Sequence, residues 1–292
     1  MLGQLLVNGL VVGSGYALIA IGHTLIFGLM KIINFAHGEF FMLGAFLAYT
    51  FATVYNGFGI GYAGAMIASV IVVSLLGYLL DKGVFKRIRK EDESVSVLVT
   101  IGLSIFIMNG ARLIWGAAPR NITNLIQGGV SLGNTTISYT KLIIVFLTIL
   151  IIAVLHFFIQ KTTTGKAFRA TFQNRDAALL AGIEVESIYT LNMTLGCALA
   201  GISGALLSMI FVLEPTMGVK AIGVAWIVVC TGSPGSVLGA IVVGYLLGVS
   251  ESLGGAYISS QYKNAIGFIV LVFVLLIKPQ GLFGKKLSRM GG

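Results

Sequence analysis

The chain has 292 residues, of which 57% are hydrophobic and only 10% are charged. Soluble domains carry about a quarter charged residues, so a globule of this composition lacks the polar surface that keeps a protein in solution. The net charge of +9 comes from cations that cluster between apolar runs, which indicates membrane topology rather than nucleic-acid binding. The composition speaks against a soluble enzyme, a disordered chain and a nucleic-acid-binding protein, and it favours a multi-pass membrane protein.

Apolar runs follow one another along the whole chain. A bilayer core about 30 Å thick takes about 20 helical residues to cross, and lipid favours helices because they satisfy their own backbone polar groups. The runs do not alternate as β-barrel strands do. We predict one transmembrane domain over residues 1–292, an all-α helical bundle of about eight or more membrane segments including broken or re-entrant helices. The runs lie at about 5–29, 35–55, 58–80, 94–115, 141–160, 188–213, 221–250 and 264–277.

Most of the basic residues fall in three polar segments, at about 81–93, 161–187 and 278–292. The positive-inside rule places such segments in the cytoplasm. The segment 116–140 carries Arg120 as its one charged residue and is rich in Asn, Thr and Gly, which is typical of an external segment. The first three spans then start from an external N-terminus.

The run 221–250 conflicts with this topology if it crosses the membrane once, because the basic tail would then lie outside. The conflict disappears if the run enters and leaves on one side, or crosses twice as two short pieces. Its middle reads TGSPGS at 231–236, a helix-breaking cluster. Interrupted helices often mark the path of a transporter, so the candidate residues are Thr231, Ser233, Pro234 and Gly235. A kinked span with the tail outside is the alternative.

A second polar cluster, Asn34, His37 and Glu39, interrupts the first apolar stretch. Glu39 is the only acidic residue among the first 80, and an ionisable group at membrane depth is costly and usually functional. Two interpretations stay open. The three residues line a polar pathway or stabilise a broken helix, or they lie at the cytoplasmic interface beside Lys31 and hold the structure.

A few other polar residues and several glycine pairs lie in or near the apolar runs. His23 stands alone in its run, which favours a packed side chain over a proton relay. Glu214 and Glu251 fall near the predicted external surface, where they form salt bridges with a docking protein or face water. Glycines spaced four apart let helices approach closely, and they predict a tightly packed bundle. The pairs are Gly9/Gly13, Gly235/Gly239 and Gly244/Gly248.

The polar stretch 164–183 mixes alanines with Arg169, Asn174 and other polar residues. This pattern predicts a short amphipathic helix that ends at Gly182 and docks into a groove of a partner, with a solvated linker as the alternative. Gly165-Lys166 does not complete a phosphate-binding loop, because the motif needs Gly at 160 and Ser or Thr at 167. We therefore expect no cofactor, metal site or enzymatic activity in this chain, and ATP-driven work would come from a separate subunit.

Three stretches together resemble the branched-chain amino acid ABC transporter permeases of the LivH class. They are YALIAIGHTLIFGLMKIINFAHGEFFMLGAF at 16–46, GKAFRATFQNRDAALLAGI at 165–183 with LNMTLGCALAGISGAL at 191–206, and TGSPGSVLGAIVVGYLLG at 231–248 with KPQGLF at 278–283. One departure concerns residues 230–236, where related sequences often read Gly-Gly-Met-Gly-Ser and this chain has Cys230, Thr231, Ser233 and Pro234.

The resemblance implies a permease subunit in a bacterial cytoplasmic (inner) membrane. Its partners would be a second related permease, two cytoplasmic ATP-binding subunits, which bind the ATP, and a soluble substrate-binding protein. The segment 165–183 corresponds to the family's cytoplasmic coupling loop, and its most recognisable positions are Gly165, Arg169, Asn174, Ala178 and Gly182.

The expected function is import of branched-chain amino acids driven by ATP. Permeases for urea, short amides or other amino acids share the framework and stay as alternatives. A passive channel or facilitator is the rival from another class, since it would use broken helices without needing the coupling loop. A membrane scaffold without transport activity is a third possibility.

Overall fold

A computed structural model describes residues 1–53, 61–122, 128–132, 135–259 and 262–284. The described chain is almost entirely helical, with one short antiparallel hairpin of β1 (Gly129–Leu132) and β2 (Thr135–Ser138). Every apolar run of the sequence contains a helix, so the predicted all-α membrane fold is confirmed. Residues 285–292 of the predicted basic tail lie outside the described residues.

The two most buried long helices, α1 (Leu2–Met30) and α9 (Val185–Leu207), form the centre of the bundle. Helix α11 (Val237–Tyr257) packs along α1 at backbone distance. A Cβ atom on Gly13 would lie 2.8 Å from the Cα of Tyr245, and one on Gly248 would lie 2.4 Å from the backbone nitrogen of Gly13. The predicted close approach of helices at glycines spaced four apart is therefore confirmed for α1 and α11, because only residues without side chains allow backbones to come this near.

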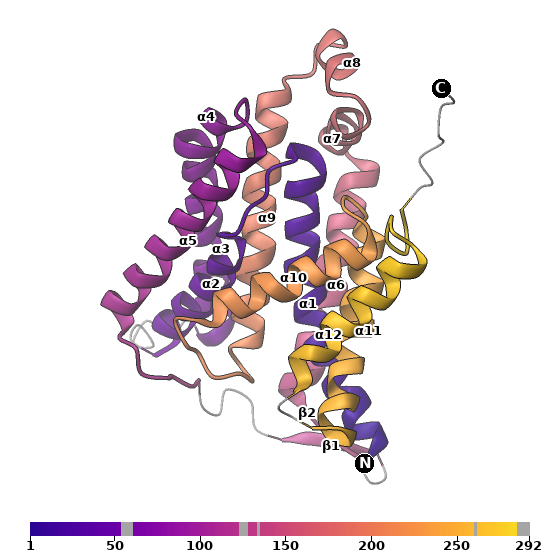
Figure 1. Cartoon of the computed structure of the whole chain (residues 1–292). Helices are drawn as coiled ribbons and strands as arrows, with labels where there is room; N and C mark the ends of the chain where they lie inside the picture. Colours follow the sequence, from indigo (N-terminus) through magenta and orange to yellow (C-terminus); the bar gives the residue numbers. More distant parts are fainter. Residues whose placement is uncertain (54–60, 123–127, 133–134, 260–261, 285–292) are drawn as a thin grey trace.

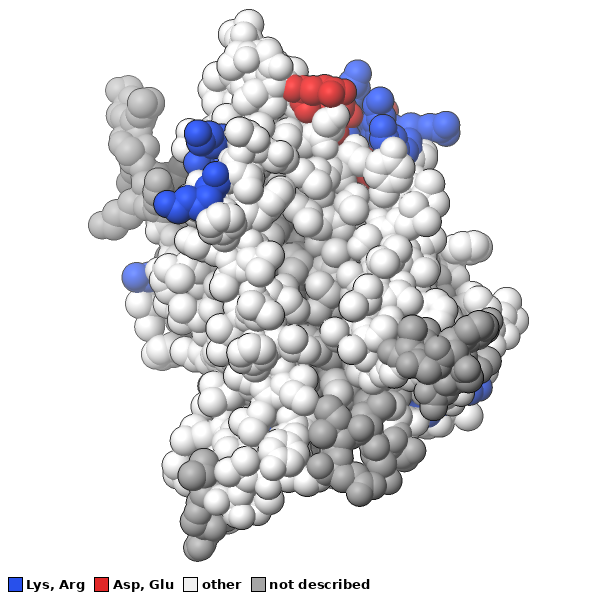
Figure 2. All heavy atoms as spheres, turned by 180° about the vertical axis from the view of Figure 1, so that it is seen from behind, with Lys and Arg blue, Asp and Glu red and all other residues white. Residues whose placement is uncertain are grey.

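Three further long helices surround this centre: α3 (Gly61–Leu80), α5 (Glu93–Trp115) and α6 (Tyr139–Lys161). Their outward faces carry large exposed apolar side chains, such as Phe106, Leu113 and Phe146. Seen from behind, the broad central area of the molecule carries no charged side chain, and charges gather mainly at one end (Figure 2). This distribution is that of a bundle whose outer helices face lipid.

Helix α3 continues past its predicted end. A π-helical turn, Asp81–Phe85, and a short helix α4 (Lys86–Ile88) extend it into the first basic segment. Arg89 then donates hydrogen bonds to the buried carboxylate of Asp81 and to Glu186 on α9. The first half of this segment is therefore a helix tied to the bundle, not a separate loop.

Helix α4 and the segment with α7 (Thr163–Gln173) and α8 (Arg175–Leu180) lie at one end of the molecule, which we call the basic end (Figure 1). The N-terminus and the β-hairpin lie at the opposite end (Figure 1). At that opposite end, the backbone of Arg120 pairs with Leu213 after α9. This arrangement agrees with the separation of basic and non-basic segments that the sequence indicates.

The run 221–250 divides into α10 (Met217–Gly232) and α11, and α12 (Lys263–Ile277) follows. The expected count of about eight or more membrane segments is not confirmed. Six helices in the described part are long and apolar enough to cross a bilayer, and α10 and α12 are shorter apolar helices. The physical reason is that α10, at 16 residues, falls short of the roughly 20 that a full crossing needs.

Candidate functional site

The first interruption lies between α1 and α2 (His37–Thr53). Lys31 takes a left-handed conformation with φ 54° and ends α1. The chain then runs without helical structure to His37, whose Nε2 lies 3.1 Å from the carbonyl oxygen of Ile19. Ile19 stands about 16 Å below the end of α1 at a rise of 1.5 Å per residue, so α2 begins deep inside the bundle.

Asn34, His37 and Glu39 are each 0% exposed. Ser104 on α5 donates a 2.9 Å hydrogen bond to Glu39, and the hydroxyl of Thr100 donates to the carbonyl of Ile33 in the non-helical segment. Helix α5 thus satisfies part of the broken backbone through Thr100, as the membrane interior requires. The structure places all three residues in the interior, away from the exposed Lys31, which is the geometry of the first interpretation.

The ring of His23 joins the start of α2 to α10. Its centroid lies 5.2 Å from that of His37 and 4.5 Å from that of Trp226. His23 is fully buried, in line with a packed side chain. Within the described part of the chain, neither ring nitrogen of His23 nor the amide group of Asn34 has a hydrogen-bond partner, so the interior at this break is polar as well as packed.

The second interruption lies between α10 and α11, where the sequence reads TGSPGS. Ser233 has φ 90° and Gly235 has φ 82°, backbone conformations that no helix adopts, so the predicted break is confirmed. The N–H of Gly235 donates a 2.8 Å hydrogen bond to the hydroxyl of Thr24 on α1. Thr231 is buried, and its carbonyl oxygen accepts a hydrogen bond from the N–H of Leu282.

Both breaks contact α1, at positions about two helical turns apart. A Cβ atom on Gly22 would lie 3.2 Å from the ring of His37, and one on Gly28 would lie 2.6 Å from the Cα of Gly235. The two candidate clusters of the sequence are therefore brought to one region of the bundle. Sequence reasoning missed the part played by α1, although its run of small residues at the breaks, Gly22 and Gly28, was visible.

The predicted coupling segment differs in one respect from expectation. The sequence predicts one amphipathic helix ending at Gly182, and the structure has two, α7 and α8, divided at Asn174. The Asn174 side chain accepts hydrogen bonds from the N–H groups of Asp176 and Ala177, both 3.0 Å. The cap starts a new helix at this point, which is why a single helix does not run through.

The other coupling positions have structural partners. A Cβ atom on Gly165 would meet the carbonyl oxygens of Phe158 and Ile159 at 2.3 and 2.4 Å, so only glycine fits where α7 turns back on α6. Arg169 donates a hydrogen bond to the Ile159 carbonyl, and Ala178 is buried at 3% exposure. Gly182, with φ 79°, ends α8 as predicted.

Helix α8 lies at the tip of the basic end (Figure 1) and bears exposed apolar residues. Leu180 is 92% exposed and Leu179 is 47% exposed, while Arg175 and Asp176 flank them with charge. Phe172 of α7 points the other way, and a Cβ atom on Gly235 would lie 2.6 Å from its ring. The coupling segment therefore connects an exposed apolar tip to the second break.

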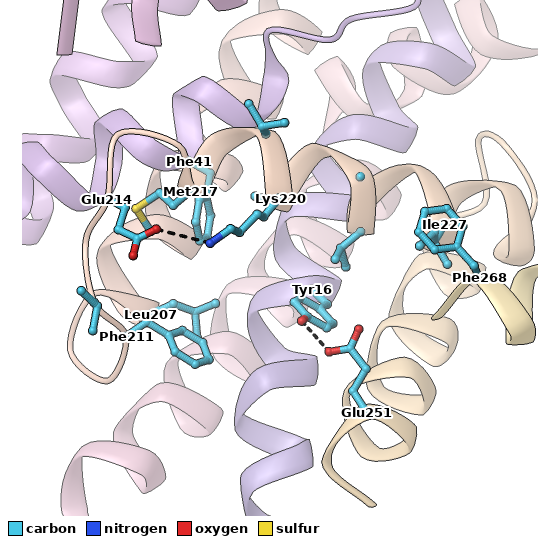
Figure 3. A pocket seen from close by; sticks show the side chains of 15 residues that line it. Tyr16, Phe41, Leu207, Phe211, Glu214, Met217, Lys220, Ile227, Glu251 and Phe268 are labelled. Atoms are coloured by element: carbon cyan, nitrogen blue, oxygen red, sulfur yellow. Dashed lines mark hydrogen bonds and ion pairs between the residues drawn. The ribbon is translucent and has the colours of Figure 1, made fainter. Parts of the chain in front are cut away.

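A cavity of about 500 Å³ lies between α1, α10, α11 and α12. Figure 3 shows the hydroxyl of Tyr16 directed at the carboxylate of Glu251, with a hydrogen bond of 2.7 Å between them. Glu251 is 2% exposed, so the interpretation in which it faces water is wrong. The side chain turns inward because the face of α11 that bears it packs against α1.

The rim of this cavity carries a second pair of charges. Lys220 lies 3.3 Å from Glu214, and their side chains are 70% and 38% exposed. For Glu214 the predicted surface position is therefore correct, although its partner belongs to the same chain. Apolar side chains form the remaining wall, among them Leu207, Met217 and Ile227 (Figure 3).

Residues 5–275 match the family described as "Branched-chain amino acid transport system / permease component". The chain belongs to this family. Because the match spans nearly every helix described above, it applies to the whole bundle. The family resemblance seen in the sequence is thereby confirmed, and so is the interpretation of the chain as a transport permease.

Individual relatives agree with the family. The chain is 35% identical to the high-affinity branched-chain amino acid transport system permease protein BraD of Pseudomonas aeruginosa, over 97% of this chain and 95% of that protein. It is 31% identical to the permease protein LivH of Escherichia coli, with the same coverage. It is also 23% identical to the permease protein LivM of Salmonella typhimurium, over 91% of this chain and 67% of that protein. The chain is thus similar to permease proteins with two different names, LivH and LivM.

Proposed function

We propose that this permease is the membrane subunit of an ATP-driven importer that moves branched-chain amino acids into a bacterial cell across its inner membrane. A second, related permease completes the membrane part, two cytoplasmic subunits bind and hydrolyse ATP, and a soluble binding protein delivers the substrate. The relatives named BraD, LivH and LivM support the substrate class and the pairing of two permeases.

The observation that carries the proposal is the contact of Phe172 with Gly235. The basic end faces the cytoplasm in this proposal, because cytoplasmic segments are rich in Lys and Arg. The exposed apolar tip of α8 then faces the ATP-binding subunits, as a surface for docking into a groove. A movement of α7 reaches the break between α10 and α11 directly through the Phe172 ring.

Transport then follows from a change in the broken helices. Short helices that end inside a bundle can move without breaking a continuous hydrogen-bond ladder, and alternating access in transporters uses such elements. ATP binding shifts the equilibrium between outward-open and inward-open states only as far as its subunits contact the two states differently. The coupling segment supplies that difference in contact.

The double variant Arg169→Glu with Gly182→Pro tests the proposal. It removes the hydrogen bond from α7 to the Ile159 carbonyl, and it places proline, fixed near −65°, at a position with φ 79°. We expect loss of ATP-dependent leucine uptake by vesicles that hold the complete importer, with the permease still in the membrane. The control Arg112→Glu changes an exposed arginine of α5 and keeps uptake. Normal uptake by the double variant would contradict the coupling role.

The same vesicles distinguish the proposal from a passive facilitator. A facilitator would carry leucine down its gradient without ATP, and the double variant would leave that flux intact. Cysteine labelling in intact cells adds a topological test. A cysteine at Lys166 that reacts with an impermeant external reagent would overturn the cytoplasmic placement of the coupling segment.

A further inference from the structure

The carboxylate of Glu251 has an unusual setting in the cavity between α1, α10, α11 and α12. Its Oε2 accepts the hydrogen bond from Tyr16 and lies 4.0 Å from the ammonium nitrogen of Lys263. Among the described residues, no hydrogen bond reaches Oε1, and the residue lines the cavity. Figure 3 shows this second oxygen directed away from Tyr16. The cavity therefore offers a held carboxylate with one acceptor atom available.

The rest of the cavity is mainly apolar. Leu207, Met217, Ile227 and Phe268 contribute to its wall, and its volume of about 500 Å³ falls in the usual range of small-molecule sites. A cationic group in such a place is costly unless a carboxylate pairs with it. Glu251 is the buried carboxylate of this wall, whereas Glu214 lies at the rim and pairs with Lys220. A buried carboxylate beside an apolar wall selects a ligand that combines an ammonium group with a hydrocarbon side chain.

The positive charge needed for the other end of an amino acid lies at the rim. Lys220 is 70% exposed on its side chain and belongs to the first turn of α10, whose N-terminus adds a partial positive charge. An α-carboxylate that faces the rim meets Lys220, whose ammonium group also pairs with Glu214 at 3.3 Å, while the substrate ammonium group lies further in. The order of charges in the cavity matches a zwitterion with an apolar side chain.

We propose that this cavity is a transit site for apolar α-amino acids, in which Glu251, positioned by Tyr16, pairs with the substrate ammonium group. The inference rests on the proposed function and adds to it the place where cargo is held and the residue that recognises it. The cavity opens in the half of the bundle away from the basic end, because the loop after α9 that carries Glu214 lies there (Figure 1). Cargo delivered from outside would meet it before reaching the two breaks.

Photo-leucine, the diazirine analogue of leucine, tests the site on the complete importer in nanodiscs. We expect it to label the cavity wall, with the adducts found by mass spectrometry. Leucine in excess suppresses this labelling, and 4-methylpentanoate, which lacks the ammonium group, does not. Glu251→Gln keeps the shape of the side chain and an acceptor for Tyr16. We expect it to raise the photo-leucine concentration that gives half-maximal labelling by at least about tenfold, because the loss of a buried charge partner usually has an effect of this size.

Matched variants separate recognition from folding. Glu251→Asp keeps the charge and retains most of the labelling, whereas Glu184→Gln makes the same chemical change at an exposed glutamate of the basic end and alters nothing. Unchanged labelling of Glu251→Gln, or equal suppression by leucine and 4-methylpentanoate, overturns the site. If the wild-type importer takes up leucine but the cavity is never labelled, the site alone fails. If the wild-type importer takes up no leucine, the proposed function fails with it.

Discussion

The contact between Phe172 and Gly235 makes a quantitative prediction about coupling. In Gly235→Ala, the new Cβ atom would lie 2.6 Å from the Phe172 ring. Ordinary van der Waals contact begins at 3.4 Å, so the ring must retreat by about 0.8 Å. The backbone φ of 82° adds roughly 1–2 kcal/mol for a residue that bears a side chain. If this free-energy cost falls on only one of the outward-open and inward-open states, the ratio of their populations changes by about 5–30-fold.

The assay compares leucine uptake with ATP hydrolysis in the reconstituted importer. We expect Gly235→Ala to lower uptake per ATP by about 5–30-fold while the complex still assembles. The added variant Phe172→Leu opens space beside the new methyl group, so the double variant recovers the part of the loss due to contact and keeps the part due to φ. Gly102→Ala on α5 is the control, because nothing lies within 4 Å of its Cβ position.

If an assembled importer with Gly235→Ala takes up as much leucine per ATP as the wild type, the Phe172–Gly235 contact does not transmit movement. A Phe172→Leu variant that makes Gly235→Ala worse would also refute this reasoning, since the contact could not then be the source of the defect. A loss of assembly in Gly235→Ala is the third contrary result, because it would show that the break holds the fold and does not transmit movement.

Three further predictions concern other contacts. Leu180→Asp places a charge on the most exposed large apolar side chain of α8 and should abolish co-purification of the ATP-binding subunits with the permease, whereas insertion into the membrane, measured by fractionation, stays normal. Gly248→Ala places a Cβ atom 2.4 Å from the backbone nitrogen of Gly13, so it should lower the free energy of unfolding of the purified protein, measured in a melting assay, by about 1–3 kcal/mol. Arg89→Ala leaves the buried Asp81 carboxylate without its charged partner, with only the Thr190 hydroxyl still donating to it, and should cost about 3–5 kcal/mol in the same melting assay, with Arg89→Ala plus Asp81→Asn regaining part of it.

The arrangement of helices along the chain was predictable because it depends on local sequence. Apolar length gives the spans, and the second break follows from Pro234 and Gly235, because Pro interrupts a helix and Gly accepts the positive φ of the turn. The division of α7 from α8 was missed because Asn174 can lie within a helix or cap the next one. Only the surroundings of the segment decide between these conformations.

The orientation of Glu251 could not be predicted from the sequence for a different reason. Helix α11 has small and apolar residues on nearly all of its faces, so its sequence shows no amphipathic pattern that would indicate which face is buried. Its partner, Tyr16, stands 235 positions away. Asn34, His37 and Glu39 could be named as candidates from the sequence because ionisable and polar groups are rare in membrane runs, whereas Tyr16 gives no such signal.

The two breaks impose a common requirement on α1. Backbone and side-chain polar groups in a membrane interior need protein partners, and α1 supplies them along one stretch: the Ile19 carbonyl to His37, the Leu25 carbonyl to Asn192, and the Thr24 hydroxyl to Gly235. Each of these bonds reaches a different element, so a shift of α1 would disturb all of them together. In the mechanism that we propose, movements of the coupling segment therefore act on the turn at Gly235, which the Thr24 hydrogen bond ties to α1, while α1 and α9 stay in place.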